Sequence, residues 1–255
     1  MLAQPHPGLR GHVLRYAGWR EHSAAPLRRV EVPFVGAVAI VCFGVPYRID
    51  GEPFTAFAGG LTDRPTDTEF AGSAAGVQVD FTPLGARRCL GLPMEELTNR
   101  AVALDDVLGP RAAELAERLH DAPGWRARFA LLDAALLRRV AAGPEPAPEV
   151  AWTFRRLAEA HGRLTIGPLA AEVGRSRRHL AARWRRDVGL GPKAVARILR
   201  FERAHRLVRG GSGLADVAYE CGYADQSHLN RDFRALAGAT PREVTFVQDA
   251  QVQPL

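Results

Sequence analysis

The sequence contains very little lysine and cysteine. Of its 34 basic residues only Lys193 is a lysine, so arginine carries almost all of the positive charge. The three cysteines, Cys42, Cys89 and Cys221, lie in largely apolar stretches without a CxxC or His-containing ligand spacing. These surroundings favour buried thiols over a metal or redox centre.

Histidine is missing between His22 and His120. The early histidines His6, His12 and His22 fit neither one face of a helix nor a zinc motif, so we assign them to surface or loop positions. We therefore expect neither a metal site nor a cofactor.

Long apolar runs are also missing. The longest, residues 35–45, is too short to span a bilayer, and residues 1–12 lack the basic segment and apolar run of a secretory signal. We expect a cytoplasmic protein without a membrane partner.

Charge is distributed unevenly along the chain. Residues 151–255 hold 18 Arg or Lys against 10 Asp or Glu, net +8, whereas residues 1–150 hold 16 against 18, net −2. An arginine-rich half is the electrostatic pattern of a phosphate-backbone binder, and the near-neutral half needs another role. The 255 residues, 47% of them hydrophobic, suffice for the cores of two domains.

Residues 213–242 predict a helix, a glycine turn and a second helix. Gly222 ends the first helix and Asp225 suits the N-cap of the second. The apolar positions follow helical spacing, and they are Leu214, Val217, Ala218, Cys221, Leu229, Phe233 and Leu236. The opposite face of the second helix is polar, with side chain types that bond base edges or phosphate. This pattern is typical of a helix-turn-helix.

The same pattern occurs about fifty residues earlier, in residues 164–189, which indicates an internal duplication. Gly174 forms the turn, Ser176 caps the second helix, and arginines surround its apolar stripe. That stripe, with the inner side of the first helix, comprises Leu169, Ala170, Val173, Leu180, Trp184 and Val188. Pro192 suits the first position of a connecting helix over residues 192–208.

The second unit closely resembles the AraC/XylS transcription regulators. The residues that carry this resemblance are Val217, Ala218, Cys221, Gly222, Tyr223, Asp225, Gln226, Ser227, His228, Arg231, Asp232, Phe233, Gly238, Thr240 and Pro241. The first unit departs from the family pattern at Trp184, where Phe is usual, and at Ala181 and Ala182, where many members carry larger polar residues. Direct base readout by this unit is therefore expected to be limited.

The resemblance implies that residues 176–188 and 225–236 enter successive major-groove segments about 34 Å apart. Its base-facing positions are Arg178, Ala181, Ala182, Gln226, Ser227, Asn230 and Arg231. The arginines expected on phosphate are Arg177, Arg185, Arg186 and Arg234. His228 is expected to hydrogen-bond within the turn rather than to contact a base.

Residues 27–81 consist of short β-type runs, broken by Gly, Pro and Asp, which predict a small barrel or sandwich. Val77, Val79 and Phe81 alternate with Gln78 and Asp80, so one face should be buried and the other exposed or lining a cavity. The architecture resembles the cupin-like sensor domains of many AraC-type regulators. The histidines of metal-binding cupins are absent, which argues against a metalloenzyme.

After Pro83 the pattern becomes helical, with apolar stripes in residues 111–120 and 125–140. Both helices could cover the barrel, or part of the second stripe, which contains Trp125, Phe129, Leu132, Leu136 and Val140, could form a homodimer seam. Residues 143–149, GPEPAPE, predict an extended linker.

These patterns together predict an α+β chain. We expect an N-terminal sensor or dimerisation domain over residues 1–142, a linker over 143–149 and an all-α DNA-binding domain over 150–248. The expected partners are double-stranded DNA, a small-molecule effector, a second copy of the chain and, for an activator, RNA polymerase.

Three functions remain open from the sequence. The first is a ligand-responsive transcription regulator, and the second is a DNA-binding regulator whose N-terminal domain only dimerises or binds a protein. The third is a DNA-repair alkyl acceptor that uses Cys42 or Cys89, the latter following Arg87 and Arg88. The first interpretation predicts a non-enzymatic protein.

Overall fold

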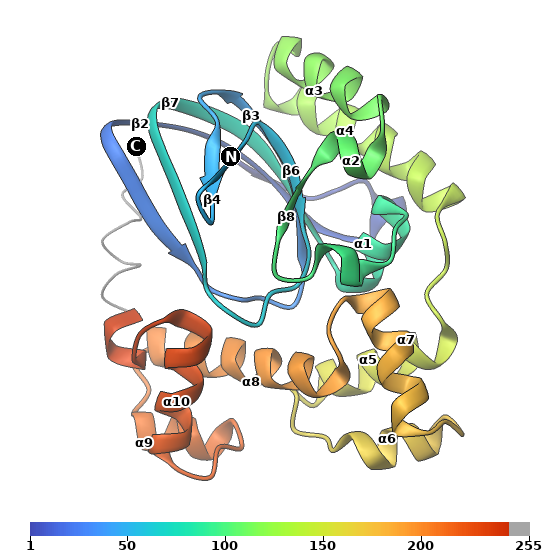
Figure 1. The fold of residues 1–255 in the computed structure, drawn as a ribbon, viewed down its shortest axis with the longest axis vertical. Coiled ribbons are helices and arrows are strands. Elements are labelled where there is room, and N and C mark those ends of the chain that lie inside the picture. Colours follow the sequence, from blue (N-terminus) through green and yellow to red (C-terminus); the bar gives the residue numbers. More distant parts are fainter. Residues whose placement is uncertain (245–255) are drawn as a thin grey trace.

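The computed structural model describes residues 1–244. It comprises a curved β-sheet, helices packed on one face of that sheet, and an all-helical C-terminal region beneath both (Figure 1). The predicted α+β class is confirmed. The predicted end of the DNA-binding domain at residue 248 lies outside the described residues.

The sheet is antiparallel and has the strand order β1-β2-β7-β3-β6-β8, with β4 paired to β7 and β5 to β4. Its strands are β1 (Leu2–Ala3), β2 (Val13–Glu31), β3 (Ala37–Gly44), β4 (Tyr47–Ile49), β5 (Glu52–Phe54), β6 (Ala56–Gly59), β7 (Thr66–Phe81) and β8 (Ala101–Ala103). Within residues 1–244, β1, β8 and β5 each pair with one strand only and form the edges, so this is a curved open sheet.

Two strands are longer than the sequence pattern predicts. β2 begins at Val13 rather than near Leu27, and β7 joins two runs that we expected to be separate. The pairing of β2 with β7 is interrupted but not ended at residues 24–26, which lie opposite Ala71 as a bulge-like irregularity. The neighbouring Gly72 has a φ of 95°. β8 was also missed within a stretch predicted to be helical.

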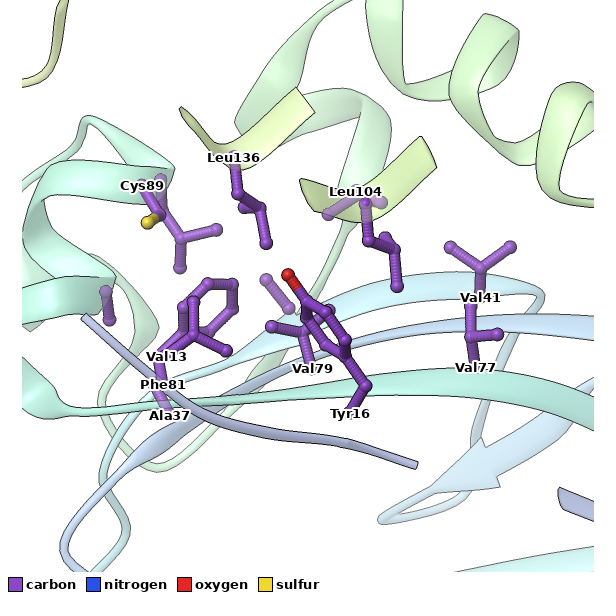
Figure 2. Close-up of a cluster of buried hydrophobic side chains, with 14 of the residues drawn as sticks. Val13, Tyr16, Ala37, Val41, Val77, Val79, Phe81, Cys89, Leu104 and Leu136 are labelled. Carbon is purple, nitrogen blue, oxygen red and sulfur yellow. The ribbon is translucent and has the colours of Figure 1, made fainter. Parts of the chain in front are cut away.

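The two faces of the sheet have different roles. Val77, Val79 and Phe81 point toward α1 (Pro83–Leu90) and α4 (Trp125–Ala142), and Figure 2 shows this buried layer. Gln78 points to the opposite, concave face and lines a cavity, as the alternation predicts. Asp80 is buried, because its carboxylate accepts hydrogen bonds from Arg15 and from Gln78, each at 2.5 Å.

The apolar stripe of α4 covers the sheet. Phe129, Leu132 and Leu136 are buried in the core that the sheet forms with α1, α2 (Leu104–Leu108) and α3 (Arg111–Asp121). The helix therefore uses Phe129, Leu132 and Leu136 within its own chain, whereas a homodimer seam through the half-buried Trp125 and Val140 stays a prediction.

The proline-rich segment is shorter than predicted. α4 ends at Ala142, and α5 (Pro148–Glu159) begins with Pro148 and Glu149, so these two residues belong to a helix and not to the predicted linker. Proline is favourable in a first helical turn because its missing N–H would have no helical partner there. Residues 1–244 also contain two short 3₁₀ helices, η1 (Pro7–Leu9) and η2 (Met94–Leu97).

The C-terminal region is built on α8 (Pro192–Arg209), which runs beneath the sheet (Figure 1). Its 18 residues make it about 27 Å long. At one end lie α5, α6 (Ile166–Glu172) and α7 (Arg177–Val188), and at the other lie α9 (Leu214–Glu220) and α10 (Gln226–Ala237). Each end has its own hydrophobic core.

Candidate nucleic-acid interface

The two helix pairs α6–α7 and α9–α10 have the same turn geometry. Gly174 and Gly222 both adopt left-handed backbone, with φ of 64° and 74°, which glycine tolerates best. In each turn the next residue donates its N–H back to the first helix, from Arg175 to Ala170 O and from Tyr223 to Ala218 O, both at 2.9 Å. The sequence duplication is thus a structural one.

Both second helices begin at the predicted caps. The Ser176 hydroxyl accepts a hydrogen bond from His179 N at 3.2 Å, and the Asp225 carboxylate accepts one from His228 N at 2.7 Å. Each cap satisfies an amide that the first helical turn leaves without a partner. The starting points of α7 and α10 are therefore fixed by local side chains.

The departure at Trp184 has a structural reason. This side chain is fully buried, and its indole nitrogen donates a hydrogen bond to the Thr153 hydroxyl of α5 at 2.9 Å. In the second unit Phe233 packs on Phe201 of α8 with ring centroids 4.8 Å apart. Both recognition helices are therefore anchored by an aromatic residue.

The orientation of α10 is held by residues of its signature motif that face α8 or the turn. Arg197 of α8 donates a hydrogen bond to the buried Asp232 carboxylate at 2.8 Å, and Arg200 lies over the Tyr223 ring. His228 Nδ1 accepts a hydrogen bond from Ala224 N at 3.4 Å, which confirms its expected role within the turn.

Nearly all predicted contact residues are accessible. The exposed members of the set are Arg177, Arg178, Ala182, Arg185, Arg186, Gln226, Ser227, Arg231 and Arg234. Ala181 and Asn230 are half-buried, and Asn230 Oδ1 is buried without a hydrogen-bond partner among the described residues. The amide of Asn230 is thus less accessible than that of Gln226.

Both recognition helices direct their C-terminal ends toward the N-terminal part of the chain. Asp187 near the end of α7 pairs with Arg87 of α1 at 3.4 Å, and Gly189 lies against Met94 and Thr98. Gly238 at the end of α10 lies near Pro65. The N-terminal ends, which contact base edges in helix-turn-helix proteins, stay in solvent.

A groove lies between α6, α7 and the start of α8, with a volume of about 630 Å³. It is lined by Arg177 and Arg185, two of the arginines predicted to contact phosphate, and by Lys193, which the sequence analysis did not predict. Lys193 lies in the first turn of α8, where the helix dipole adds positive potential. Because Lys193 follows Pro192, the sequence indicates that it lies in the first turn of a helix. That it lies beside α7 is visible only in the folded chain.

A second cavity, of about 420 Å³, occupies the concave face of the sheet. Within it the Arg29 guanidinium binds the Glu21 carboxylate through two hydrogen bonds of 3.1 and 2.6 Å, and the Tyr47 hydroxyl donates to the same carboxylate. The cavity is large enough for an organic ligand.

The thiols are in surroundings that disfavour the thiolate. Burial raises the pKa of Cys42 to about 11 and that of Cys89 to about 12, and it also raises the pKa of Cys221. For Cys89 the nearby Arg139 and Arg88 only partly offset burial. Residues 1–244 contain no cluster of three or more His, Cys, Asp or Glu side chains suited to a metal ion.

No helix within residues 1–244 is long and apolar enough to cross a membrane.

Two units with the same turn, each capped and each packed at one end of α8, define a double helix-turn-helix protein.

The comparisons with known proteins agree with this class. Residues 169–245 match the family described as "Helix-turn-helix domain". A putative AraC-like transcription regulator of Streptomyces antibioticus is 36% identical over 98 residues, 38% of this chain and 32% of that protein. The transcriptional activator RhaS of Escherichia fergusonii is 30% identical over 105 residues, 41% of this chain and 37% of RhaS. The chain thus spans about a third of the length of these relatives.

Solved structures extend the likeness to the whole fold. ToxT of Vibrio cholerae aligns over 91% of this chain and 97% of its own, with a TM-score of 0.52 and 9% identity. A ToxT structure with a bound unsaturated fatty acid aligns over 92% and 95%, with a TM-score of 0.51 and 10% identity. The C-terminal region thus matches the helix-turn-helix domain family and is similar in sequence to AraC-like regulators, so the predicted resemblance is confirmed.

Proposed function

We propose that the protein is a sequence-specific DNA-binding transcription regulator in which α7 and α10 read successive major-groove segments. The observation that carries this proposal is the pair of equivalent turns at Gly174 and Gly222, each presenting the polar N-terminal end of a recognition helix to solvent. Because the helices lie at opposite ends of one rigid element, one chain can read an asymmetric site.

In this proposal each predicted residue has a role on the duplex. The base-facing set is Arg178, Ala181, Ala182, Gln226, Ser227, Asn230 and Arg231, and the phosphate set is Arg177, Arg185, Arg186 and Arg234, joined by Lys193. Arginine and glutamine side chains at a helix start suit guanine and adenine edges, whereas the groove basic residues suit the backbone.

We further propose that a small molecule in the cavity of the sheet modulates DNA binding. Residues 32–35 support a physical link, because Val32 and Phe34 line the cavity while the Val35 amide donates a hydrogen bond to Glu202 of α8 at 2.9 Å. A ligand that moves this segment acts directly on the helix between the two units.

The second candidate is a regulator whose N-terminal domain only dimerises or binds a protein. A dimer could use the half-buried Trp125 and Val140 of the α4 stripe but not Phe129, Leu132 or Leu136, which are buried. The alkyl-acceptor function is disfavoured by the raised pKa values of the Cys42 and Cys89 thiols.

The test is a selection of genomic DNA fragments with the full-length protein, followed by affinity measurements at two salt concentrations with and without a metabolite pool. An asymmetric motif about two helical turns long supports two successive major-groove contacts. A metabolite response supports the sensor role, a motif without any response supports the second candidate, and the absence of a motif contradicts sequence-specific binding.

A further inference from the structure

The cavity of the sheet is lined by alternate residues of its strands. β2 contributes Trp19 and Glu21 before the irregularity at residues 24–26, and Arg29 and Glu31 after it. Side chains two residues apart share one face of a strand, so Trp19 lies beside Glu21 and Arg29 beside Glu31, and all four line the same cavity. β2 therefore supplies two carboxylates, one guanidinium and one indole ring to the cavity.

The walls of the cavity are largely aromatic and aliphatic. Trp19 meets Tyr47 edge to face, with ring centroids 6.2 Å apart, and Phe34, Ile40 and Phe57 complete the apolar lining. Such a surface favours an apolar ligand body and offers ring faces that attract a cation.

The charged side chains of this cavity differ in whether they are paired. Arg29 is held by Glu21 in a two-bond ion pair, and Asp50 pairs with Arg64 at 2.7 Å. The Glu31 carboxylate makes no ion pair or hydrogen bond with any residue of the described range 1–244. Among the described residues, Glu31 is therefore a lining carboxylate without a bonded cation, and Arg100 is a lining guanidinium without a bonded carboxylate.

Glu31 remains reachable from the cavity. Its side chain keeps substantial solvent exposure, yet the surrounding protein atoms raise its pKa by desolvation, against the opposing effect of Arg29. A carboxylate in such surroundings gains most from a partner that restores its lost solvation, which is a cationic hydrogen-bond donor.

We propose that the cavity binds a small organic ammonium ion whose charge pairs with Glu31 and whose apolar body packs on Trp19, Tyr47 and Phe34. This proposal rests on the proposed sensor function of the cavity. The one competing feature is Arg100, an exposed guanidinium in the lining whose Nε donates to Glu96 O. It would favour an anion instead, so the test must compare both charges.

The experiment measures binding of matched probes to the full-length protein by calorimetry. Three apolar bodies, benzyl, phenethyl and naphthylmethyl, are each supplied with an ammonium, a hydroxyl and a carboxylate group. We expect at least one ammonium to bind about tenfold more tightly than its alcohol, and the carboxylates to bind more weakly still. Equal binding of the three charge types, preferred binding of carboxylates, or no binding of any ammonium overturns the proposal.

Two substitutions assign the preference to one side chain. Glu31→Gln should lower the affinity for the ammonium about tenfold and leave the affinity for the alcohol unchanged. Glu52→Gln, on an exposed residue of β5 outside the cavity lining, is the matched control and should change neither. Glu31→Asp, which keeps the charge, should retain part of the preference and serves if the glutamine variant does not fold. An ammonium preference that survives Glu31→Gln overturns the assignment.

Failure of this proposal is distinguishable from failure of the sensor function. If carboxylates bind and alter the affinity for the selected DNA, the cavity is a sensor but takes anions. If no probe binds and the metabolite pool leaves DNA affinity unchanged, both the ligand class and the sensor function are wrong, while DNA recognition by α7 and α10 is unaffected.

Discussion

Arg231 and Arg234 lie three residues apart on α10 and are both exposed, but their expected roles differ. Replacing Arg231 with Ala should weaken binding to the selected site by about 1–3 kcal/mol and relax one base position. Arg234→Ala should instead weaken binding to all sequences similarly and flatten the dependence of log affinity on log salt. Competition binding with single-base variants at several salt concentrations measures both effects. If the two variants respond identically to every sequence, the division into base and phosphate contacts is wrong.

The cysteines provide a prediction of low reactivity. With the thiol pKa raised to about 11 for Cys42 and about 12 for Cys89, the thiolate fraction near pH 8 is very small. Iodoacetamide should therefore modify the native protein far more slowly than a free cysteine, and unfolding in urea should restore the ordinary rate. Mass spectrometry after a timed reaction measures each site. Rapid alkylation of Cys89 alone would revive the alkyl-acceptor hypothesis.

At the scale of elements, the two turn glycines are the sharpest test of the helix-turn-helix geometry. Gly174→Ala and Gly222→Ala should each lower the free energy of unfolding by about 1–2 kcal/mol, because a Cβ is strained in left-handed backbone. A methyl group at Gly174 would have no neighbouring atom within 4 Å, so the expected cost there is conformational rather than steric.

Gly167 is the matched contrast to these glycines. It lies within α6, where the atoms nearest to an added methyl group would belong to Arg177 at 3.5 Å, an ordinary contact distance. Gly167→Ala should therefore raise stability by up to about 1 kcal/mol, since alanine favours a helix. Urea denaturation of all three variants gives the comparison, and destabilisation by Gly167→Ala as large as that by Gly222→Ala would contradict it.

The C-terminal elements were predictable because their signals are local. Helical spacing, the caps Ser176 and Asp225, and the turn glycines all act within a few residues, and the structure has each of them. The lengths of β2 and β7 were not predictable in this way, since each is stabilised by the other strand, which lies far away in the sequence. The three-residue β8 likewise exists only because β6 offers it an edge.

Parts of the candidate site could not be predicted either, because they depend on contacts between residues far apart in the sequence. The base-facing positions follow from helical periodicity, and the structure exposes most of them, although their contacts with DNA stay predictions. Lys193 and the pairing of Arg87 with Asp187 depend on which elements meet in space. No pattern within a short window carries that information.

At the scale of the whole molecule, Arg87 and Asp187 join α1 to the end of α7. Both side chains are buried, and Asp187 also accepts a hydrogen bond from Ala147 N at 2.8 Å. The Asp187 carboxylate of α7 thus contacts both α1 and the segment that precedes α5. Removing one member of a buried ion pair leaves the other uncompensated.

Arg87→Ala should therefore lower the free energy of unfolding by about 3–5 kcal/mol. Glu145→Gln provides the control, because Glu145 is 80% exposed in its pair with Arg88 and its loss should cost less than about 1 kcal/mol. Chemical denaturation followed by tryptophan fluorescence measures both. Similar losses for the two variants would show that the buried pair does not hold the two regions together.

The core around Trp184 contains Leu61, a fully buried side chain from the loop between β6 and β7, far upstream in the sequence of the first helix of that core. The boundary between the two halves in sequence is thus not their boundary in space. If residues 148–244 were joined to a different N-terminal domain, the core around Trp184 would have a cavity in place of the Leu61 side chain. The helices of the first unit thus share one core with a loop of the N-terminal region, and separating the two would expose that core to water.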